Sequence, residues 1–308
     1  MKIVAGLGAV EDYQTLVQAG ADEVFCGYVP HSWNKKYGNL MPLNRREVLY
    51  YHVQIGTFSE MKILSKMMNA MGVPVTITFN ALYYTEKQYE EIAEMISQLM
   101  AIGFTRYIIA DIGLLIFLRQ KGIDCNIHIS GEMGEVNRLT FSILKPYDIS
   151  RMIFHRQNTI QDIKSCIAEN QNETIEYEAF FLNERCQFHG GFCNSMHCDE
   201  LTHMCRVPYQ LVPMKNENDR LDIPRTEPGE IPDVVGGTGC GLCALPLLKD
   251  AGVTHLKIVG RGNYVECMTR DIKYARRAIQ IMEEDTSSYQ QRIIELLGGQ
   301  CSHDCYYV

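Results

Sequence analysis

The 308-residue sequence lacks any apolar run of about 18 residues, the length that a membrane-spanning helix requires. Its first residues, Met1 to Val4, lead directly into a strand-like segment and do not have the layout of a secretion signal. Low-complexity segments are also absent. These absences predict a cytoplasmic protein that is not associated with a membrane.

An excess of basic residues is missing as well. The chain has 29 Lys and Arg against 37 Asp and Glu, which gives a net charge of −8. A broad nucleic-acid-binding face would have to form against this net field. Hydrophobic residues make up 46% of the chain and charged residues 21%, as in an ordinary globular protein with a large core. We therefore expect a small-molecule or peptide substrate rather than RNA.

Cysteine, by contrast, is abundant, with 12 in the chain. In a reducing cytosol this content favours metal or cluster ligation over a disulfide scaffold. Four cysteines occur singly in periodic segments and are expected in the core: Cys26, Cys125, Cys166 and Cys267. Six others gather in one stretch: Cys186, Cys193, Cys198, Cys205, Cys240 and Cys243.

Short β-branched runs alternate with amphipathic helical stretches, several of which end in Gly. The predicted strands are residues 2–7, 23–27, 75–80, 107–111, 126–130, 151–155, 174–180 and 255–259. Eight such units favour an α/β fold of the closed (β/α)8 TIM-barrel type over a doubly wound open sheet. We expect a single barrel over residues 1–285, followed by a C-terminal helix and a cysteine-containing tail over 286–308.

Two long connections interrupt the alternation. Residues 182–241 follow the seventh predicted strand and contain most of the clustered cysteines. Residues 28–57 follow the second strand and are a candidate lid. Both would lie at the C-terminal face, where barrel active sites are found.

The spacing of the clustered cysteines is informative but leaves alternatives open. Cys186 and Cys193 are separated by six residues, whereas structural zinc sites usually use close C-x₂₋₄-C pairs. Wide spacing with thiolates alone favours an iron–sulfur cluster. Zinc and unligated thiols are the alternatives at this point.

Several motifs resemble those of the U32 family, whose members are named as peptidases. In the cysteine-rich region they are Glu178-Ala-Phe180, Cys186-x₆-Cys193 with Gly191 between, Cys205-Arg206, and Leu242-Cys243 followed by Leu256 to Arg261. Upstream, Ala19 to Phe25, Thr78 to Asn80, Ala110 to Gly113, His128 to Ser130, Asn137 and Arg151 to Arg156 match its barrel strands in order. The resemblance covers roughly residues 1–285.

The resemblance implies a TIM-barrel-like enzyme with a [4Fe–4S] cluster on four cysteines. Several members support oxygen-independent hydroxylation of ubiquinone precursors or RNA bases, some with prephenate as oxygen donor; others are described as collagenase-like peptidases. The family positions fall on Cys186, Cys193, Cys205 and Cys243, with Cys198 and Cys240 as alternates. The leading hypothesis is an oxygen-independent hydroxylase or related redox enzyme, with a peptidase as the alternative.

The chain also departs from the family pattern. Val259 occupies the place of a glutamate in the motif that ends at Arg261, so chemistry that needs this carboxylate is in question. The chain ends near the point where longer members continue into another domain. The missing glutamate suggests a third hypothesis: a non-catalytic, cluster-bearing subunit that forms a homo- or heterodimer with a related U32 protein.

Candidate catalytic residues lie near the ends of predicted strands: Asn80, Asp111, His128, Arg156, Glu178, Lys257 and Arg261. Each has a structural alternative. Asn80, Asp111, His128 and Arg156 are alternatively satisfied internal polar groups or loop caps. Glu178 is equally suited to a buried ion pair with Lys257. Arg206 and Arg261 are candidates for binding an anionic substrate. The tail pair, Cys301 and Cys305, is expected to be frayed or partner-facing.

Overall fold

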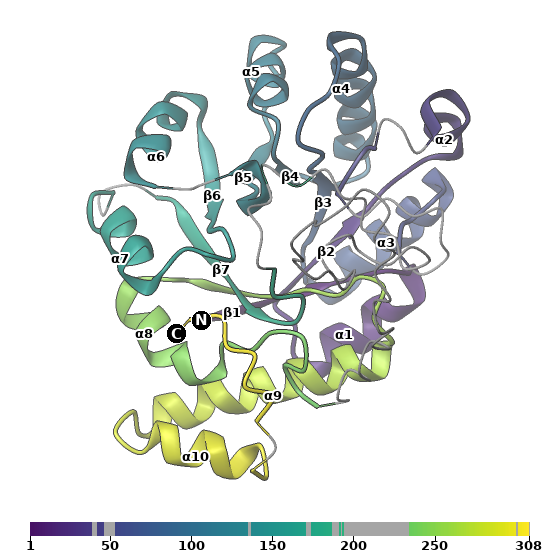
Figure 1. Ribbon diagram of the computed structural model, residues 1–308. Helices are drawn as coiled ribbons and strands as arrows, with labels where there is room; N and C mark the ends of the chain where they lie inside the picture. Colours follow the sequence, from purple (N-terminus) through teal and green to yellow (C-terminus); the bar gives the residue numbers. More distant parts are fainter. Residues whose placement is uncertain are drawn as a thin grey trace, which may run out of the picture.

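A closed barrel of eight parallel strands forms the centre of the protein (Figure 1). The computed structural model describes residues 1–38, 42–45, 53–134, 137–170, 174–186, 191, 193, 234–299 and 301–307. The strands are β1 Lys2–Gly6, β2 Glu23–Gly27, β3 Val75–Phe79, β4 Arg106–Ile109, β5 Asn126–Ile129, β6 Ile149–Ile153, β7 Glu176–Leu182 and β8 His255–Ile258. Because β1 pairs with β8, the sheet is closed, which confirms the barrel and excludes the open sheet.

Helices surround this barrel, as Figure 1 shows. They are α1 Tyr13–Ala19, α2 His31–Tyr37, α3 Phe58–Met71, α4 Glu86–Ala101, α5 Ile112–Gln120, α6 Arg138–Leu144, α7 Ile160–Ala168, α8 Leu245–Ala251, α9 Val265–Glu284 and α10 Tyr289–Leu296. Helix α10 packs on α9. No described helix has both the length and the apolar character needed to cross a bilayer.

Local sequence signals explain where the helices begin and end. Thr57 and Glu60 form a reciprocal capping box at the start of α3, and each satisfies a backbone N–H of the first turn. Gly20 ends α1 in the left-handed conformation, with φ of 114°, which a side chain would disfavour. Gly252 ends α8 in the same way. The expected alternation of capped helices and short strands is therefore present.

The two faces of the strands differ in chemistry. Outward-facing residues such as Ile77, Ile127 and Leu256 join the main core beneath the helices. Alternate positions point into the barrel, where a second apolar cluster comprises Val4, Phe25, Ile108, Ile153, Phe180, Val259 and the tail residue Tyr306. The remaining inward positions are largely charged. The barrel interior is thus an apolar layer combined with an ionic one.

The long connection after β7 returns to the barrel and meets the C-terminal tail. Leu182 forms an antiparallel bridge with Cys240, which in turn forms a parallel bridge with Cys305. The Tyr289 hydroxyl of α10 donates to the Leu242 carbonyl at 2.7 Å. Helix α10 and the described tail around Cys305 are therefore packed on the barrel.

Candidate functional site

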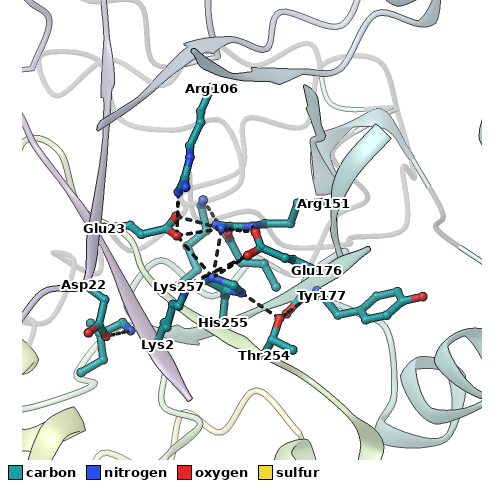
Figure 2. A network of polar contacts seen from close by, with 12 residues as sticks. Lys2, Asp22, Glu23, Arg106, Arg151, Glu176, Tyr177, Thr254, His255 and Lys257 are labelled. Carbon is teal, nitrogen blue, oxygen red and sulfur yellow. Dashed lines mark hydrogen bonds and ion pairs between the residues drawn. The ribbon is translucent and has the colours of Figure 1, made fainter. Parts of the chain in front are cut away.

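An ionic network occupies the amino-terminal end of the barrel interior (Figure 2). The fully buried Arg151 guanidinium lies 2.9 Å from Glu23 and 2.6 Å from Glu176. Arg106 also donates to Glu23, at 2.9 Å. Burial alone would raise the pKa of Glu23, but His255 and the two arginines lower it well below its usual value. Because this end of a TIM barrel usually serves stability, we assign the network a structural role.

The same network offers the only three described His, Cys, Asp or Glu ligand atoms within 4.8 Å of one another: those of Glu23, Glu176 and His255. However, Arg151 Nη2 already lies 3.0 Å from His255 Nε2 and donates to both carboxylates. A metal ion there would have to displace a buried guanidinium. The group is therefore a poor metal site.

One layer higher, Glu178 connects the network to the mouth of the barrel. Its carboxylate lies 2.5 Å from Lys257 Nζ and 2.8 Å from Arg151 Nη1. Burial would raise the pKa of Glu178, but these two cations lower it to about 2. The expected ion pair between Glu178 and Lys257 is present. Burial lowers the pKa of Lys257, against the attraction of Glu178.

His128 belongs to this layer too. It is almost fully buried, and burial together with the Arg151 charge holds its pKa well below the usual value. The ring is therefore neutral at neutral pH. Its role as a catalytic group is still a prediction.

A pocket opens at the carboxyl-terminal mouth. Its lining includes four of the predicted residues, Asn80, Arg156, Lys257 and Arg261. It also includes side chains that the sequence did not single out as site residues, namely Phe25, Arg45, Thr78, Ile108, Glu132, Ile153, Phe180 and Glu184. Four cationic and two carboxylate side chains line this pocket. The Glu178 carboxylate, which pairs with Lys257, adds a third negative charge, so the net charge around the pocket is +1.

Arg261 is held by neutral oxygens from three parts of the chain. Its guanidinium lies 3.2 Å from Thr78 Oγ1, 3.2 Å from Asn44 Oδ1 and 3.5 Å from Gln54 Oε1. Gly27 makes room for this arrangement, since a Cβ there would lie 2.4 Å from Arg261 Nη1. Asn44 and Gln54 belong to the insertion after β2, which thus contributes to the mouth.

Arg156 and Arg45 flank the Glu132 carboxylate. Arg156 Nη1 donates a short hydrogen bond to Glu132, while Arg45 Nε is 3.8 Å from the other carboxylate oxygen. The Arg156 guanidinium also stacks over the Phe180 ring at 4.0 Å. Within the described residues, the buried Nε atoms of both arginines have no hydrogen-bond acceptor.

Two predicted residues have local structural partners. Asp111 caps α5 by accepting from the N–H groups of Gly113 and Leu114, and it also accepts from Tyr84 N and the Tyr89 hydroxyl. It does not line the pocket. Asn80 lines the pocket, and its Oδ1 accepts from the Arg45 N–H at 3.1 Å. It thereby anchors Arg45 at the mouth.

The described loop cysteines lie on two sides of the mouth. The Cys193 carbonyl accepts from Arg45 Nη1 at 2.7 Å. Cys186 lines a separate groove that shares Arg156 with the mouth pocket. Cys198, Cys205 and Arg206 lie outside the described residues. Cys243 and the alternate Cys240 lie beside the tail cysteines Cys301 and Cys305.

Sequence reasoning missed Arg45, Asn44, Gln54 and Glu132. The first three lie in an insertion without periodicity, whose contacts to β8 cannot be read locally. Glu132 follows β5 in a 3₁₀ turn, Gly131–Met133, at a strand end that was already recognised as a site position. Its place after Ser130 is the signal that could have found it.

The chain is similar to a named protein of Escherichia coli and to several solved structures. Over 251 residues it is 20% identical to tRNA hydroxylation protein P of Escherichia coli K12, covering 78% of this chain and 51% of that protein. It thus spans about half the length of this relative. A solved structure described as the U32 peptidase Mk0906 is 10% identical over 62% of this chain and 73% of that one, with a TM-score of 0.45. A 2,3-dimethylmalate lyase structure has 9% identity over 97% and 90% of the chains and a TM-score of 0.43.

Structural likenesses this distant carry no argument about function. The family comparison is stronger, because the sequence model of peptidase family U32 matches residues 8–306, nearly the whole chain. The protein belongs to peptidase family U32.

Proposed function

We propose that this U32 protein is a cytoplasmic redox enzyme that hydroxylates its substrate without molecular oxygen and binds a small carboxylate at the barrel mouth. The observation that carries the carboxylate site is the mouth pocket lined by Arg45, Arg156, Lys257 and Arg261, whose charges the nearby carboxylates do not fully balance. A carboxylate is the anion that arginine binds best. The relative named for tRNA hydroxylation supports the reaction class.

The positive balance of the pocket favours an anion. Arg261 reaches the pocket from the end of β8 and Arg156 from the end of β6, so the two guanidinium groups approach from different strands. Phe25, Ile108 and Phe180 line the pocket between them. An anionic group held by the arginines would place its apolar part against these side chains. A small carboxylic acid with a hydrophobic ring fits this chemistry.

Loop cysteines fit the family's iron–sulfur cluster in part. Cys186 and Cys193 are both partly exposed; Cys186 lines a groove together with Arg156, and the Cys193 carbonyl accepts from Arg45. With Cys205 they would supply three thiolates, and the fourth is Cys243 or the alternate Cys198. When bound, the cluster would supply one-electron chemistry or, with an open iron, a site for substrate.

The chain's own groups serve substrate binding. Lys257 Nζ lies 4.0 Å from the Phe25 ring centre at the pocket wall and is paired with Glu178, so it adds a fixed positive charge to the anion site. Hydroxylation converts a substrate C–H bond into C–OH. The oxygen atom comes from a donor molecule that is reduced by two electrons while the substrate carbon is oxidised by two. This exchange releases no net proton, so Lys257 acts through its charge.

Anaerobic assays test this proposal. Protein reconstituted with iron and sulfide is incubated with prephenate and either total tRNA or a cell metabolite extract, and mass spectrometry follows the gain of one oxygen atom. Prephenate affinity is measured by calorimetry on wild type, Arg156→Gln and the surface control Arg138→Gln. Loss of a charged hydrogen bond predicts roughly 10- to 150-fold weaker binding for Arg156→Gln only.

The proposal would be contradicted if the protein neither bound prephenate nor added an oxygen atom to any substrate. Peptide cleavage by a zinc-loaded form would instead support the hydrolase that the family name describes.

A further inference from the structure

Four cysteines from two distant segments converge beside the barrel. Cys240 and Cys243 lie at the end of the long connection after β7, at and within the short 3₁₀ helix Leu242–Ala244. Cys301 and Cys305 lie in the C-terminal tail. Both pairs have the close spacing, C-x₂-C and C-x₃-C, that delivers thiolates to a common centre.

Backbone pairing holds the tail in this position. Cys240 N donates to the Asp304 carbonyl at 2.8 Å, and Tyr306 N donates to the Cys240 carbonyl at 2.9 Å. Arg185 pairs with the Asp304 carboxylate at 2.7 Å. The expectation of a frayed tail is therefore wrong for residues 301–307. The chain aligns Cys305 with Cys240 through specific hydrogen bonds.

Helix α10 fixes the other pair from the opposite side. Gln290 Nε2 donates to the Cys243 carbonyl at 2.8 Å, next to the Tyr289 contact with Leu242. Hence the segments that carry Cys240, Cys243 and Cys305 are anchored by hydrogen bonds to the backbone.

The thiols are close enough to affect one another electrostatically. Burial raises the pKa of Cys240 to about 12, and Cys243, Cys301 and Cys305 act in the same direction. The tail thiols also raise the pKa of Cys243, after burial. None of these four cysteines is in a disulfide.

We propose that Cys240, Cys243, Cys301 and Cys305 form a four-thiolate metal centre that fixes the C-terminal tail to the barrel. This centre goes beyond the cluster of the proposed function and shares only Cys243 with the cysteines considered there. It would assign Cys243 to the tail centre. Cys186, Cys193, Cys198 and Cys205 then remain as four ligands for the loop.

The described cysteine sulfurs are not as close together as the ligands of a closed zinc site. A tetrahedral zinc ion with Zn–S bonds near 2.3 Å holds its sulfurs about 3.8 Å apart. Among the described cysteines, no three sulfurs lie within 4.8 Å of one another. A cluster accepts thiolates that are several ångströms farther apart. A zinc ion would require the Cys240/Cys243 pair and the Cys301/Cys305 pair to move closer together.

The centre would also stabilise the mouth. Tyr306 follows Cys305 directly, stacks on Phe180 with ring centres 6.4 Å apart, and donates a short hydrogen bond to the Asn183 carbonyl. Phe180 in turn supports Arg156. Losing the centre should therefore release Tyr306 from the wall of the mouth.

Metal analysis of full-length protein purified without oxygen tests the proposal. Iron, acid-labile sulfide and zinc are measured in wild type, Cys301→Ser/Cys305→Ser, Cys186→Ser/Cys193→Ser and the control Cys267→Ser, another half-buried cysteine. We expect the tail variant to lose about four iron and four sulfide, or one zinc, per chain. The Cys186/Cys193 variant should keep this centre, whatever becomes of the loop cluster.

Alkylation of the wild type gives a second test that does not depend on variants folding. Iodoacetamide should leave Cys240, Cys243, Cys301 and Cys305 unmodified until the metal is removed by acid or a chelator, as peptide mass spectrometry would show. Unchanged metal content in the tail variant would overturn the proposal. So would tail thiols that react at once in metal-loaded protein, or a Cys240–Cys305 disulfide.

Discussion

Replacing Glu178 by Gln should destabilise the protein strongly. The carboxylate is fully buried and contacts Lys257 at 2.5 Å and Arg151 at 2.8 Å. Removing one partner of a buried pair leaves an uncompensated charge and costs about 3–5 kcal/mol. With an unfolding entropy of about 2.1 cal/mol/K per residue, or about 0.65 kcal/mol/K for this chain, the thermal midpoint should fall by roughly 5–8 °C.

Circular dichroism at pH 7 measures this midpoint. The matched control is Asp250→Asn, which breaks an exposed Lys164–Asp250 pair of 2.8 Å and should change the midpoint far less. The double variant Glu178→Gln/Lys257→Met removes both charges and should recover part of the loss. A Glu178→Gln midpoint no lower than that of the control would refute the reasoning.

The lowered pKa of Glu178 predicts that its contribution to stability depends on pH. The folded pKa of Glu178 is about 2, below its ordinary value of 4.5. Its stabilising contribution is therefore complete above about pH 4.5 and is lost as the pH falls through 2. The difference in unfolding free energy between wild type and Glu178→Gln should narrow over this range. A difference that is constant from pH 5 to 2 would show that Glu178 is not held ionised by its partners.

Three further variants test the mouth and its supports. Gly27→Ala should displace Gln54 and Arg261, because its Cβ would lie 1.7 Å from Gln54 Oε1 and 2.4 Å from Arg261 Nη1. Carboxylate affinity in calorimetry should fall about tenfold or more, and unchanged affinity would count against this placement. Tyr306→Phe should lower the unfolding free energy in urea by about 1–3 kcal/mol, since a buried carbonyl loses its donor; no change would mean that water replaces it. Asp111→Ala should cost about 1–2 kcal/mol by leaving α5 uncapped, whereas Asp111→Asn should retain much of the cap; equal losses would exclude capping as the cause.

Much of the barrel could be predicted from the sequence because its signals are local. β-Branched runs such as Val75–Phe79, and glycines such as Gly20 that end a helix, indicate each unit without knowledge of distant contacts. The Glu178–Lys257 pair was also foreseeable, because two inward positions on neighbouring strands must satisfy each other.

The rest depends on contacts between segments far apart in sequence. Arg45 reaches the mouth from an insertion, and only the folded chain shows that its Nε is buried beside Glu132. Likewise, nothing near Cys305 indicates that it pairs with Cys240, because the tail has no periodicity. Charge and spacing suggested thiolate ligation, but the grouping of the thiols follows from the fold.

The most direct test of the proposed cluster enzyme is to measure iron and acid-labile sulfide, with a visible spectrum, on protein purified anaerobically. The comparison is between wild type and Cys186→Ser/Cys193→Ser. We predict broad absorption near about 400 nm and the loss of about four iron and four sulfide per chain in the variant. Equal iron and sulfide in both proteins, or zinc without sulfide in the wild type, would contradict a cluster at the mouth.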